Sequence, residues 1–429
     1  MYRLIYTFIY FLILPLYFLR LLVKGVKNPD YLYRWNERLG FGRLKPSGEK
    51  KVLWVHAVSV GEVNASIPLI RGILKKYEDS EVLVTTTTPT GSKILMDKLG
   101  SRIKHQYLPI DLPIFLNRFL RIWNPRALIL LETEIWPNLI AMCKKKDIFV
   151  SLVNARLSER SLKKYLRFKD VISESISDLD LIIAQYKTDQ KRFRQLVPRK
   201  KINLCGNLKF DQEIPDQFLE ISNSIKEGWS INEKMRPTLI GASTHEGEEE
   251  ALLDGFIKIK QELDNPLLIL VPRHPERFNR VKQIIRSYNL SISVRSIKEE
   301  VQNDTDVLLG DTMGELNFLY SLSDVAFVGG SLINHGGQNL LEPAALSLPI
   351  ISGPNLRNFE EIAKKLKNQG ALEIVKGPKD IQEVFSKLIS DKRELNKRKK
   401  ASRLVYEENR GAVDRILNDL DNPLQILLS

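Results

Sequence analysis

The chain has 429 residues, of which 43% are hydrophobic, and it carries a formal net charge of +13 at pH 7. This length exceeds what one hydrophobic core usually organises, so it predicts two domains. The two cysteines, Cys143 and Cys205, lack metal-ligand spacing, which argues against a disulfide framework or a zinc site and favours a reducing compartment. The basic residues are dispersed without an interleaved aromatic stripe, so the charge favours solvated faces and an anionic phospholipid surface over nucleic acid.

Residues 4–23 form an apolar run that contains one charge, Arg20, and one proline, Pro15. Its length approaches that needed to cross the hydrocarbon core of a bilayer. No small-residue cleavage site follows, so residues 1–27 are expected to be a retained anchor rather than a cleaved signal peptide. The excess of Lys and Arg after the run predicts that the remaining chain is cytoplasmic. Pro15 and Arg20 both weaken a central span, which leaves open whether the helix crosses the bilayer or lies partly in its interface.

Beyond residue 50, short apolar runs alternate with longer amphipathic stretches, a pattern typical of a parallel sheet covered by helices on both faces. Strands are predicted at residues 51–58, 81–87, 127–132, 149–154, 181–185 and 202–206, with helices between them, for example at 63–76 and 90–99. After a break at residues 209–236 the alternation restarts, with strands predicted at 237–242, 267–272, 290–294, 307–309, 325–329 and 349–351.

The predicted fold class is therefore α/β, with two doubly wound Rossmann-like units that face a cleft. Residues 28–210 are assigned to the first domain and residues 211–429 to the second, with a last helix that could pack back on the first. Ligands of such units bind beyond the carboxyl ends of the strands, so the chemistry is expected in the loops that lead from strands into helices.

The loop at residues 59–62 follows a strand and places Glu62 in the first turn of the next helix. A carboxylate there could act as a general base that deprotonates a hydroxyl group. The alternative is a structural role in which Glu62 only complements the helix dipole. The helix N-terminus favours the charged form, which would make Glu62 an available but weaker base.

Glu132 and Glu134 follow the apolar residues 127–131. Charges directly behind a buried strand cost free energy unless they are paired or exposed in a cleft, so a functional and a structural role weigh about equally. Pro137 is expected to begin the following helix, where its missing amide proton costs nothing.

In the second domain, residues 241–248 join a strand to a helix that Ser243 or Thr244 could cap, with Glu246 or Glu248 in its first turn. The same free amides could instead bind an anion.

Arg273 ends another strand, where its guanidinium suits a phosphate or carboxylate, although an isolated arginine is more often part of a surface pair. The adjacent His274 is interpreted as a loop residue that makes hydrogen bonds rather than as a ligand-binding residue.

Residues 328–332 and 335–344 form a glycine-rich loop that enters a helix carrying Glu342. Glycines allow close approach of phosphate, and a carboxylate at this offset can accept both hydroxyls of a ribose, which together favour a nucleotide-sugar donor. The G-x-G-x-x-G and Walker fingerprints are absent from the sequence, which argues against dinucleotides and ATP.

Residues 178–180 and 304–306 have the Asp-x-Asp spacing that many glycosyltransferases use for a divalent ion. Both pairs directly precede apolar runs, so they are interpreted as turn residues at strand starts. No metal and no cofactor is expected.

An ordered series of segments over nearly the whole chain resembles the bacterial transferases of 3-deoxy-D-manno-octulosonic acid (Kdo) in lipopolysaccharide synthesis. The matching segments are residues 34–40, 59–62, 88–91, 132–138, 154–158, 206–211, 243–248, 272–277, 310–316 and 336–342. Gln338 and Leu340 stand where members of this family can carry other residues.

The resemblance implies a GT-B glycosyltransferase that transfers Kdo from CMP-Kdo to the lipid A precursor lipid IVA, with inversion at the anomeric carbon. It implies that Glu62 is the general base and that Glu132 is a supporting acidic residue. It implies three CMP-binding segments, which comprise Pro272, Arg273, Met313, Gly314, Glu315, Asn339, Leu340, Leu341 and Glu342. Their chemistry suggests that Arg273 meets the phosphate, Glu342 the ribose and the loop at Met313 the base.

The implied location is the cytoplasmic side of the cell inner membrane, where anionic phospholipid, donor and acceptor would all favour a basic surface. One alternative is a GT-B transferase that uses a UDP-sugar, as in peptidoglycan assembly. Another is a membrane-bound scaffold with a decayed site.

Overall fold

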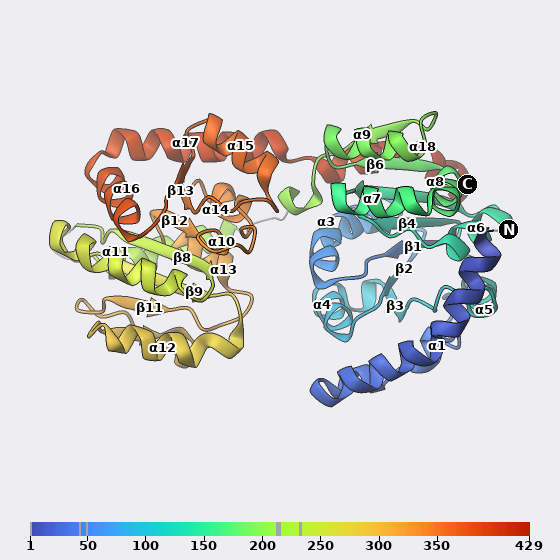
Figure 1. Ribbon diagram of the computed structural model, residues 1–429, viewed down its shortest axis with the longest axis horizontal. Coiled ribbons are helices and arrows are strands. Elements are labelled where there is room, and N and C mark those ends of the chain that lie inside the picture. The colour runs from blue at the N-terminus through green and yellow to red at the C-terminus, as the bar shows by residue number, and fades with distance from the viewer. Residues whose placement is uncertain (1, 43, 49, 212–215, 231–233) are drawn as a thin grey trace. The chain divides into compact units, whose positions relative to one another are not determined.

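The computed structural model describes residues 2–42, 44–48, 50–211, 216–230 and 234–429. They form two compact units, Met1–Gln212 with Arg410–Ser429 and Glu213–Asn409. Each unit is built around its own parallel sheet with helices on both faces (Figure 1). The predicted junction at residues 209–236 includes residues 212–215 and 231–233, which lie outside the described residues.

The sheet of the first unit has the strand order β3-β2-β1-β4-β5-β6-β7, and every pairing is parallel. Its strands are β1 Val52–His56, β2 Glu81–Thr86, β3 Lys104–Tyr107, β4 Ala127–Leu131, β5 Phe149–Ala155, β6 Leu181–Ala184 and β7 Ile202–Leu204. The six strands predicted in this half of the chain are confirmed to within two residues at each end.

Ten helices belong to the first unit among the described residues: α1 Tyr2–Lys27, α2 Trp35–Arg38, α3 Val60–Lys76, α4 Pro89–Leu99, α5 Pro113–Trp123, α6 Pro137–Lys145, α7 Glu159–Arg167, α8 Lys169–Ser177, α9 Lys187–Leu196 and α18 Ala412–Leu428. Pro137 begins α6, as predicted.

Successive side chains of a strand point to opposite faces of the sheet. Both sets are hydrophobic here, so both faces of the sheet are apolar. Trp54, Leu128 and Leu130 belong to one buried cluster, whereas Val55 and Ile129 belong to the other. This double burial explains why the strands appear in the sequence as continuous apolar runs rather than alternating ones.

The sheet of the second unit has the order β10-β11-β9-β8-β12-β13-β14 and is also parallel throughout. Its strands are β8 Thr238–Thr244, β9 Leu267–Pro272, β10 Ile292–Val294, β11 Val307–Leu309, β12 Val325–Val328, β13 Ile350–Ser352 and β14 Leu372–Ile374. Its helices are α10 Asp216–Gly228, α11 Glu248–Glu262, α12 Phe278–Ser287, α13 Leu316–Ser321, α14 Leu341–Ala345, α15 Glu360–Asn368, α16 Pro378–Ser390 and α17 Lys392–Asn409.

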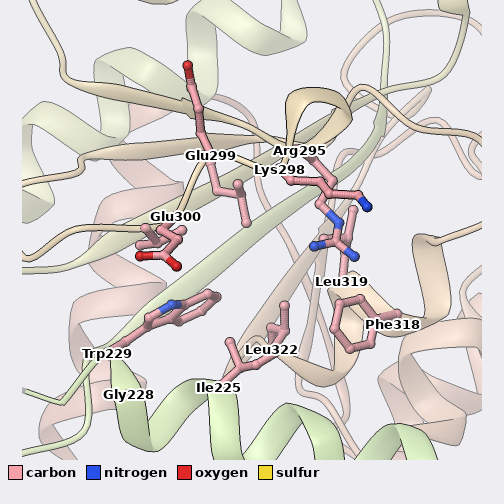
Figure 2. Close-up of a pocket in the computed structure, with 12 residues that line it drawn as sticks. Ile225, Gly228, Trp229, Arg295, Lys298, Glu299, Glu300, Phe318, Leu319 and Leu322 are labelled. Carbon is pink, nitrogen blue, oxygen red and sulfur yellow. The ribbon is translucent and has the colours of Figure 1, made fainter.

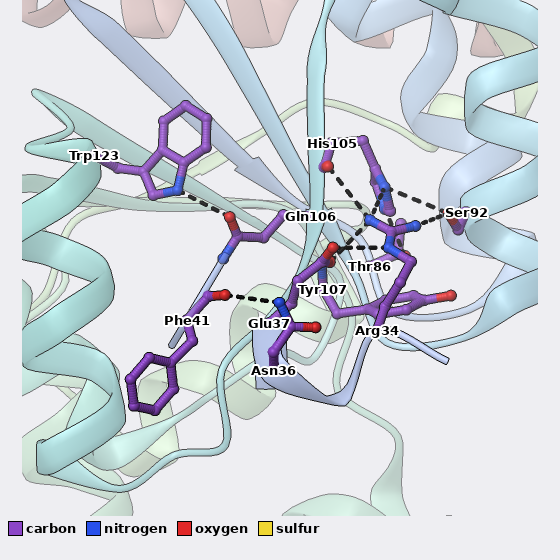
Figure 3. Close-up of polar contacts among 10 residues, drawn as sticks. All are labelled: Arg34, Asn36, Glu37, Phe41, Thr86, Ser92, His105, Gln106, Tyr107 and Trp123. Atoms are coloured by element: carbon purple, nitrogen blue, oxygen red, sulfur yellow. Dashed lines mark hydrogen bonds and ion pairs between the residues drawn. The ribbon is translucent and has the colours of Figure 1, made fainter. Parts of the chain in front are cut away.

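The sequence missed two strands, β3 and β14, and both lie at a sheet edge. Strand β3 reads Lys-His-Gln-Tyr, so it lacks an apolar run, yet its last three residues are buried. Polar contacts hold it instead: Trp123 Nε1 donates to Gln106 Oε1 at 3.1 Å, and the ring of His105 lies between Thr86 and Ser92 (Figure 3).

The segment at residues 34–41 binds to this polar edge. Glu37 accepts hydrogen bonds from Arg34 and from the backbone amide of Tyr107, each at 2.8 Å (Figure 3). Asn36 closes the turn by donating to the carbonyl of Phe41 at 2.8 Å. The matching segment at residues 34–40 therefore connects α1 to the sheet.

Helix α18 closes the first unit although it lies about 200 residues after the rest of it in the chain. The carboxylate of Asp211 accepts hydrogen bonds from the amides of Gly411 at 2.7 Å and Val413 at 2.5 Å, which satisfies free donors at the helix start. A Cβ at Gly72 in α3 would lie 2.7 Å from the Leu417 side chain, so glycine there allows the two helices to pack.

One buried carboxylate organises the loops at the carboxyl edge of the second sheet. Glu248, fully buried at the start of α11, accepts hydrogen bonds from the amides of His245, Gly330, Ser331 and Leu332 at 2.7 to 3.0 Å. The β8–α11 loop and the loop after β12 are thereby held together.

We expect Glu248→Gln to destabilise the second unit by about 3 kcal/mol, because the new amide group cannot accept from the two backbone amides that it would face. Glu246→Gln is the matched control, since Glu246 is exposed two residues away. Urea unfolding, with hydrogen exchange at residues 329–332, measures the effect. Equal midpoints and exchange rates in the two variants would contradict it.

Candidate functional site

The predicted acidic residues of the first unit lie at the carboxyl edge of its sheet. Strands β1 and β4 are adjacent and parallel, so the loops that follow them, which carry Glu62 and Glu132, meet at one edge. The structure therefore places these acidic residues where strands lead into helices, as predicted.

Glu62 is 8% exposed and takes part in the start of α3. Ser59 Oγ accepts from the amide of Glu62 at 3.2 Å and donates to Glu62 Oε1 at 2.9 Å, while Glu62 Oε2 accepts from the amide of Val58 at 2.8 Å. The structural role left open by the sequence is therefore present. A carboxylate offers about four acceptor positions, so these contacts leave room for a substrate hydroxyl.

Burial raises the pKa of Glu62 above its ordinary value; the amide of Val58 opposes this shift and the charge of Glu132 adds to it. The expectation that the helix N-terminus makes Glu62 a weaker base is wrong, because loss of solvation outweighs the favourable amide contacts. A carboxylate with a raised pKa is a stronger base once it is ionised.

Glu132 directly follows β4 and has a left-handed backbone, with φ at 55°. Its side chain is half-buried and makes neither hydrogen bond nor ion pair with any residue that the structure describes. Non-glycine residues in this conformation are strained and cluster at functional sites. Asn154 in β5 and Ser243 in β8 share the conformation, with φ at 51° and 53°.

Glu134 and His56 add a contact that the sequence did not predict. His56 Nε2 is buried, lies 3.9 Å from Glu134 Oε2 and has no hydrogen-bond partner among the described residues. Burial raises the pKa of Glu134 to about 8 and lowers that of His56 to about 4, so at neutral pH this contact joins a protonated carboxyl to a neutral imidazole. The feature of the sequence that could have indicated this contact is Glu134, the second glutamate of the Glu-Thr-Glu motif.

In the second unit, the three predicted CMP-binding segments follow neighbouring strands. Residues 272–273 end β9, residues 313–315 follow β11 and residues 339–342 follow β12, and these strands lie in the order β11-β9-β8-β12. All three segments therefore lie along the carboxyl edge of the same sheet.

Arg273 places a guanidinium at this edge of the sheet. Its backbone amide donates to the carbonyl of Thr244 at 3.0 Å, while its side chain is exposed and has no hydrogen bond or ion pair within the described part of the chain. Pro272 is buried at the end of β9. Nearby Arg277 is instead paired with the buried Glu249, Nη1 to Oε1 at 2.6 Å.

Three histidines gather beside Arg273. The ring centroid of His245 lies 4.2 Å from that of His335 and 5.4 Å from that of His274, and its Nε2 lies 3.2 Å from Gln338 Nε2. Burial, then the neighbouring cationic groups, lowers the pKa of His245 to about 4, so its ring is neutral at pH 7. His274 is thus a loop residue packed on another ring.

The segment at residues 313–315 is exposed at Met313 and left-handed at Gly314, with φ at 87°. Glu315 is already engaged: it pairs with Arg295, whose Nη2 lies 2.9 Å from Glu315 Oε1, and it accepts from Thr312. Arg295 holds the pKa of Glu315 below its usual range.

Arg295 also lines a pocket of about 440 Å³ that includes none of the predicted site residues. Figure 2 shows the indole of Trp229 on one side of this pocket and the ring of Phe318 on the other, with the Arg295 guanidinium on the Phe318 side. The Arg295–Glu315 pair connects this pocket to the 313–315 segment.

Asn339 and Glu342 are half-buried, and Asn339 Nδ2 donates to Glu342 Oε1 at 3.1 Å. Leu340 and Leu341 are buried at 0% and 2% exposure, so neither presents its side chain to a ligand.

The second aspartate of each Asp-x-Asp pair holds the fold together. Asp180 accepts from the amide of Val150 at 2.8 Å, and Asp306 accepts from the amide of Ser291 at 3.0 Å and pairs with Lys260. Within the described residues, no group of three or more His, Cys, Asp and Glu side chains is arranged to hold a metal ion.

Comparison with known proteins matches each half of the chain to a transferase family model. Residues 33–212 match the family model described as 3-deoxy-D-manno-octulosonic-acid transferase (kdotransferase), and residues 250–405 match that of glycosyl transferases group 1. The 3-deoxy-D-manno-octulosonic acid transferase of Haemophilus influenzae is 38% identical over 97% of this chain and 98% of its own. That of Bordetella pertussis is 32% identical over 89% of each chain.

Solved structures confirm the predicted GT-B fold. A glycosyltransferase from Rickettsia africae has a TM-score of 0.58 at 14% identity, covering 87% of this chain and 100% of that one. The UDP-GlcNAc 2-epimerase from Neisseria meningitidis has the same TM-score at 17% identity, covering 86% and 99%. The full-length relatives decide the activity: this chain is a glycosyltransferase and belongs to the 3-deoxy-D-manno-octulosonic acid (Kdo) transferase family.

Proposed function

We propose that the enzyme transfers Kdo from CMP-Kdo to lipid IVA, a lipid A precursor, with inversion and without a metal ion. One observation carries this proposal. The three segments proposed to bind the donor all lie along the carboxyl edge of the second sheet, over the adjacent strands β11, β9, β8 and β12. One of them contains Arg273, whose exposed side chain has no partner among the described residues. Family membership supports the choice of sugar.

The two units have different tasks in this proposal. The first, residues 28–210 with the C-terminal helix, binds the acceptor and supplies the base; the second binds the nucleotide. Glu62 takes the proton of the attacking acceptor hydroxyl, and the raised pKa of its carboxyl suits this role. The charge of Glu132 keeps Glu62 basic and stabilises positive charge that develops on the sugar.

On the donor side, Arg273 neutralises the phosphate of the departing CMP, a task that a divalent ion performs in other glycosyltransferases. Asn339 and Glu342 hold the ribose, and the backbone at Met313 and Gly314 contacts the base. Glu315 fixes the shape of that segment through Arg295.

Helix α1 is long and apolar enough, by length and composition, to enter a membrane. We assign the enzyme to the cytoplasmic side of the inner membrane, where α1 anchors it to phospholipid beside an acceptor that stays in the bilayer. Nucleic acid is not a partner in this proposal.

Purified enzyme incubated with CMP-Kdo and lipid IVA is expected to yield Kdo-modified lipid detectable by mass spectrometry, with and without EDTA. A UDP-sugar in place of CMP-Kdo is the control and should give no product. Transfer from the UDP-sugar alone would overturn the donor assignment, and loss of activity in EDTA that added Mg²⁺ restores would overturn the metal-free mechanism.

Glu62→Gln is expected to lower kcat by about 1000-fold, because a neutral amide cannot accept the proton. Ser59→Ala separates catalysis from capping: it removes the same helix cap, costs about 1 kcal/mol of stability and leaves the carboxylate in place. Both variants are assayed by saturating kinetics and thermal melting. If they lose similar, small amounts of activity, Glu62 is a cap and not a base.

Arg273→Gln is expected to weaken binding of CMP by about 30-fold while leaving cytidine binding unchanged, because only the phosphate contact is lost. Arg280→Gln is the matched control, since Arg280 is exposed on α12 and has no partner among the described residues. Calorimetric titration of both ligands measures the difference. An equal loss of CMP and cytidine affinity would show that Arg273 does not act on the phosphate.

A further inference from the structure

On a water-soluble protein a surface helix packs its apolar face on the core and exposes its polar face, but helix α1 does the reverse. The stripe that packs on the first unit is rich in hydroxyl groups, whereas the outer face is built from Leu, Ile and Phe. Exposed fractions on the outer face reach 74% at Leu4 and 64% at Phe8, and they are 50% at Ile5, 59% at Leu12 and 54% at Leu19. The surroundings of this face must therefore be apolar.

The N-terminal half of α1 is tied to the first unit by polar contacts. Tyr6 donates a hydrogen bond to the buried carboxylate of Asp111 at 2.9 Å, and Thr7 Oγ1 lies 2.9 Å from Asn138 Oδ1. Figure 1 shows this end of the helix beside α6, whose first turn holds Asn138.

The C-terminal half is tied to the same unit. Arg38 Nη1 donates to the hydroxyl of Tyr17 at 3.0 Å, and the rings of Phe18 and Trp35 lie 5.1 Å apart. Leu21 is 5% exposed. Arg38 itself is buried at 1% exposure and donates to the carbonyl of Thr87, so this end is fixed to the sheet.

Contacts from Tyr6 to Leu21 cover about 22 Å of helix at 1.5 Å per residue. A helix that crossed the bilayer while keeping them would bring Asp111 and Asn138 into the hydrocarbon core. A charged side chain is strongly unfavourable there because it loses its hydration. The docked helix and a transmembrane path are therefore incompatible.

We propose that α1 lies in the plane of the membrane, with its Leu, Ile and Phe face in the acyl region of an anionic phospholipid leaflet and its tyrosine stripe on the protein. This rests on the membrane anchoring proposed above and decides between a crossing and an interfacial helix. Arg20, exposed on α1, and Lys24, 5.1 Å from the ring of Tyr31, can extend to lipid phosphates as long basic side chains do at interfaces.

The test uses the full chain in phosphatidylglycerol-containing vesicles, with single cysteines at Ile5, Leu12 and Leu19 carrying a fluorophore. These positions are seven residues apart on one face, and the native Cys143 and Cys205 are buried. Depth-dependent quenching by spin-labelled lipids is expected to place all three labels at the same depth. A crossing helix separates successive labels by about 10 Å along the membrane normal, and that result would overturn the proposal.

A cysteine at Tyr2 gives an independent readout. With the catalytic units outside sealed vesicles, a membrane-impermeant thiol reagent should label it fully before detergent is added; labelling only after detergent means that the helix crosses. Flotation with the vesicles distinguishes a failure of the proposed membrane anchoring from a failure of the proposed in-plane orientation of α1. A chain that does not float contradicts the anchoring itself, whereas one that floats with unequal label depths contradicts only the in-plane helix.

Discussion

The second unit depends on one buried carboxylate that is surrounded by backbone amides. Glu248 accepts from four backbone amides of two loops, and those loops carry His245 and His335 and lead to Asn339 and Glu342. Gly329 is required for the same reason, because a Cβ there would lie 2.6 Å from the carbonyl of Ser243. A buried carboxylate that loses one of its amide donors leaves a polar group unsatisfied, so these four contacts favour a single arrangement of the two loops.

The two units use a glutamate at a helix start in different ways. Glu248 is fully enclosed and its oxygens are saturated by amides, which makes it a structural anion. Glu62 has fewer partners and lies near Glu132 and Glu134, and burial raises the pKa of its carboxyl. The number of donors around each carboxylate, rather than its place on the helix, separates a scaffold residue from a candidate base.

Much of the fold could be predicted from the sequence because both sheets are buried on two faces. Strands β9 and β11 were located to the residue, since continuous apolar runs flanked by turns identify such strands. Strand β3 escaped because it is held at an edge by polar side chains, and a run such as Lys-His-Gln-Tyr has no apolar signal.

The candidate site was predictable in part, and the reason is geometric. A carboxylate or arginine after a strand can be recognised in a sequence, so the positions of Glu62, Glu132 and Arg273 at the sheet edges were expected. Contacts between loops far apart in the chain cannot be recognised in this way. The packing of His245 on His335, the Arg295–Glu315 pair and the amides around Glu248 each join segments that only the folded sheet brings together.

The contact between Asp211 and the start of α18 has a consequence for biosynthesis. The core under α3 includes Ile416, Leu420 and Leu424, which are translated after the entire second unit. While the ribosome is still making that unit, the first one has an uncovered apolar face and no partner for Asp211. Domains generally fold as units during synthesis, but here the unit that begins first is completed last. Under the anchoring proposed for α1, the nascent chain spends this interval at the membrane surface.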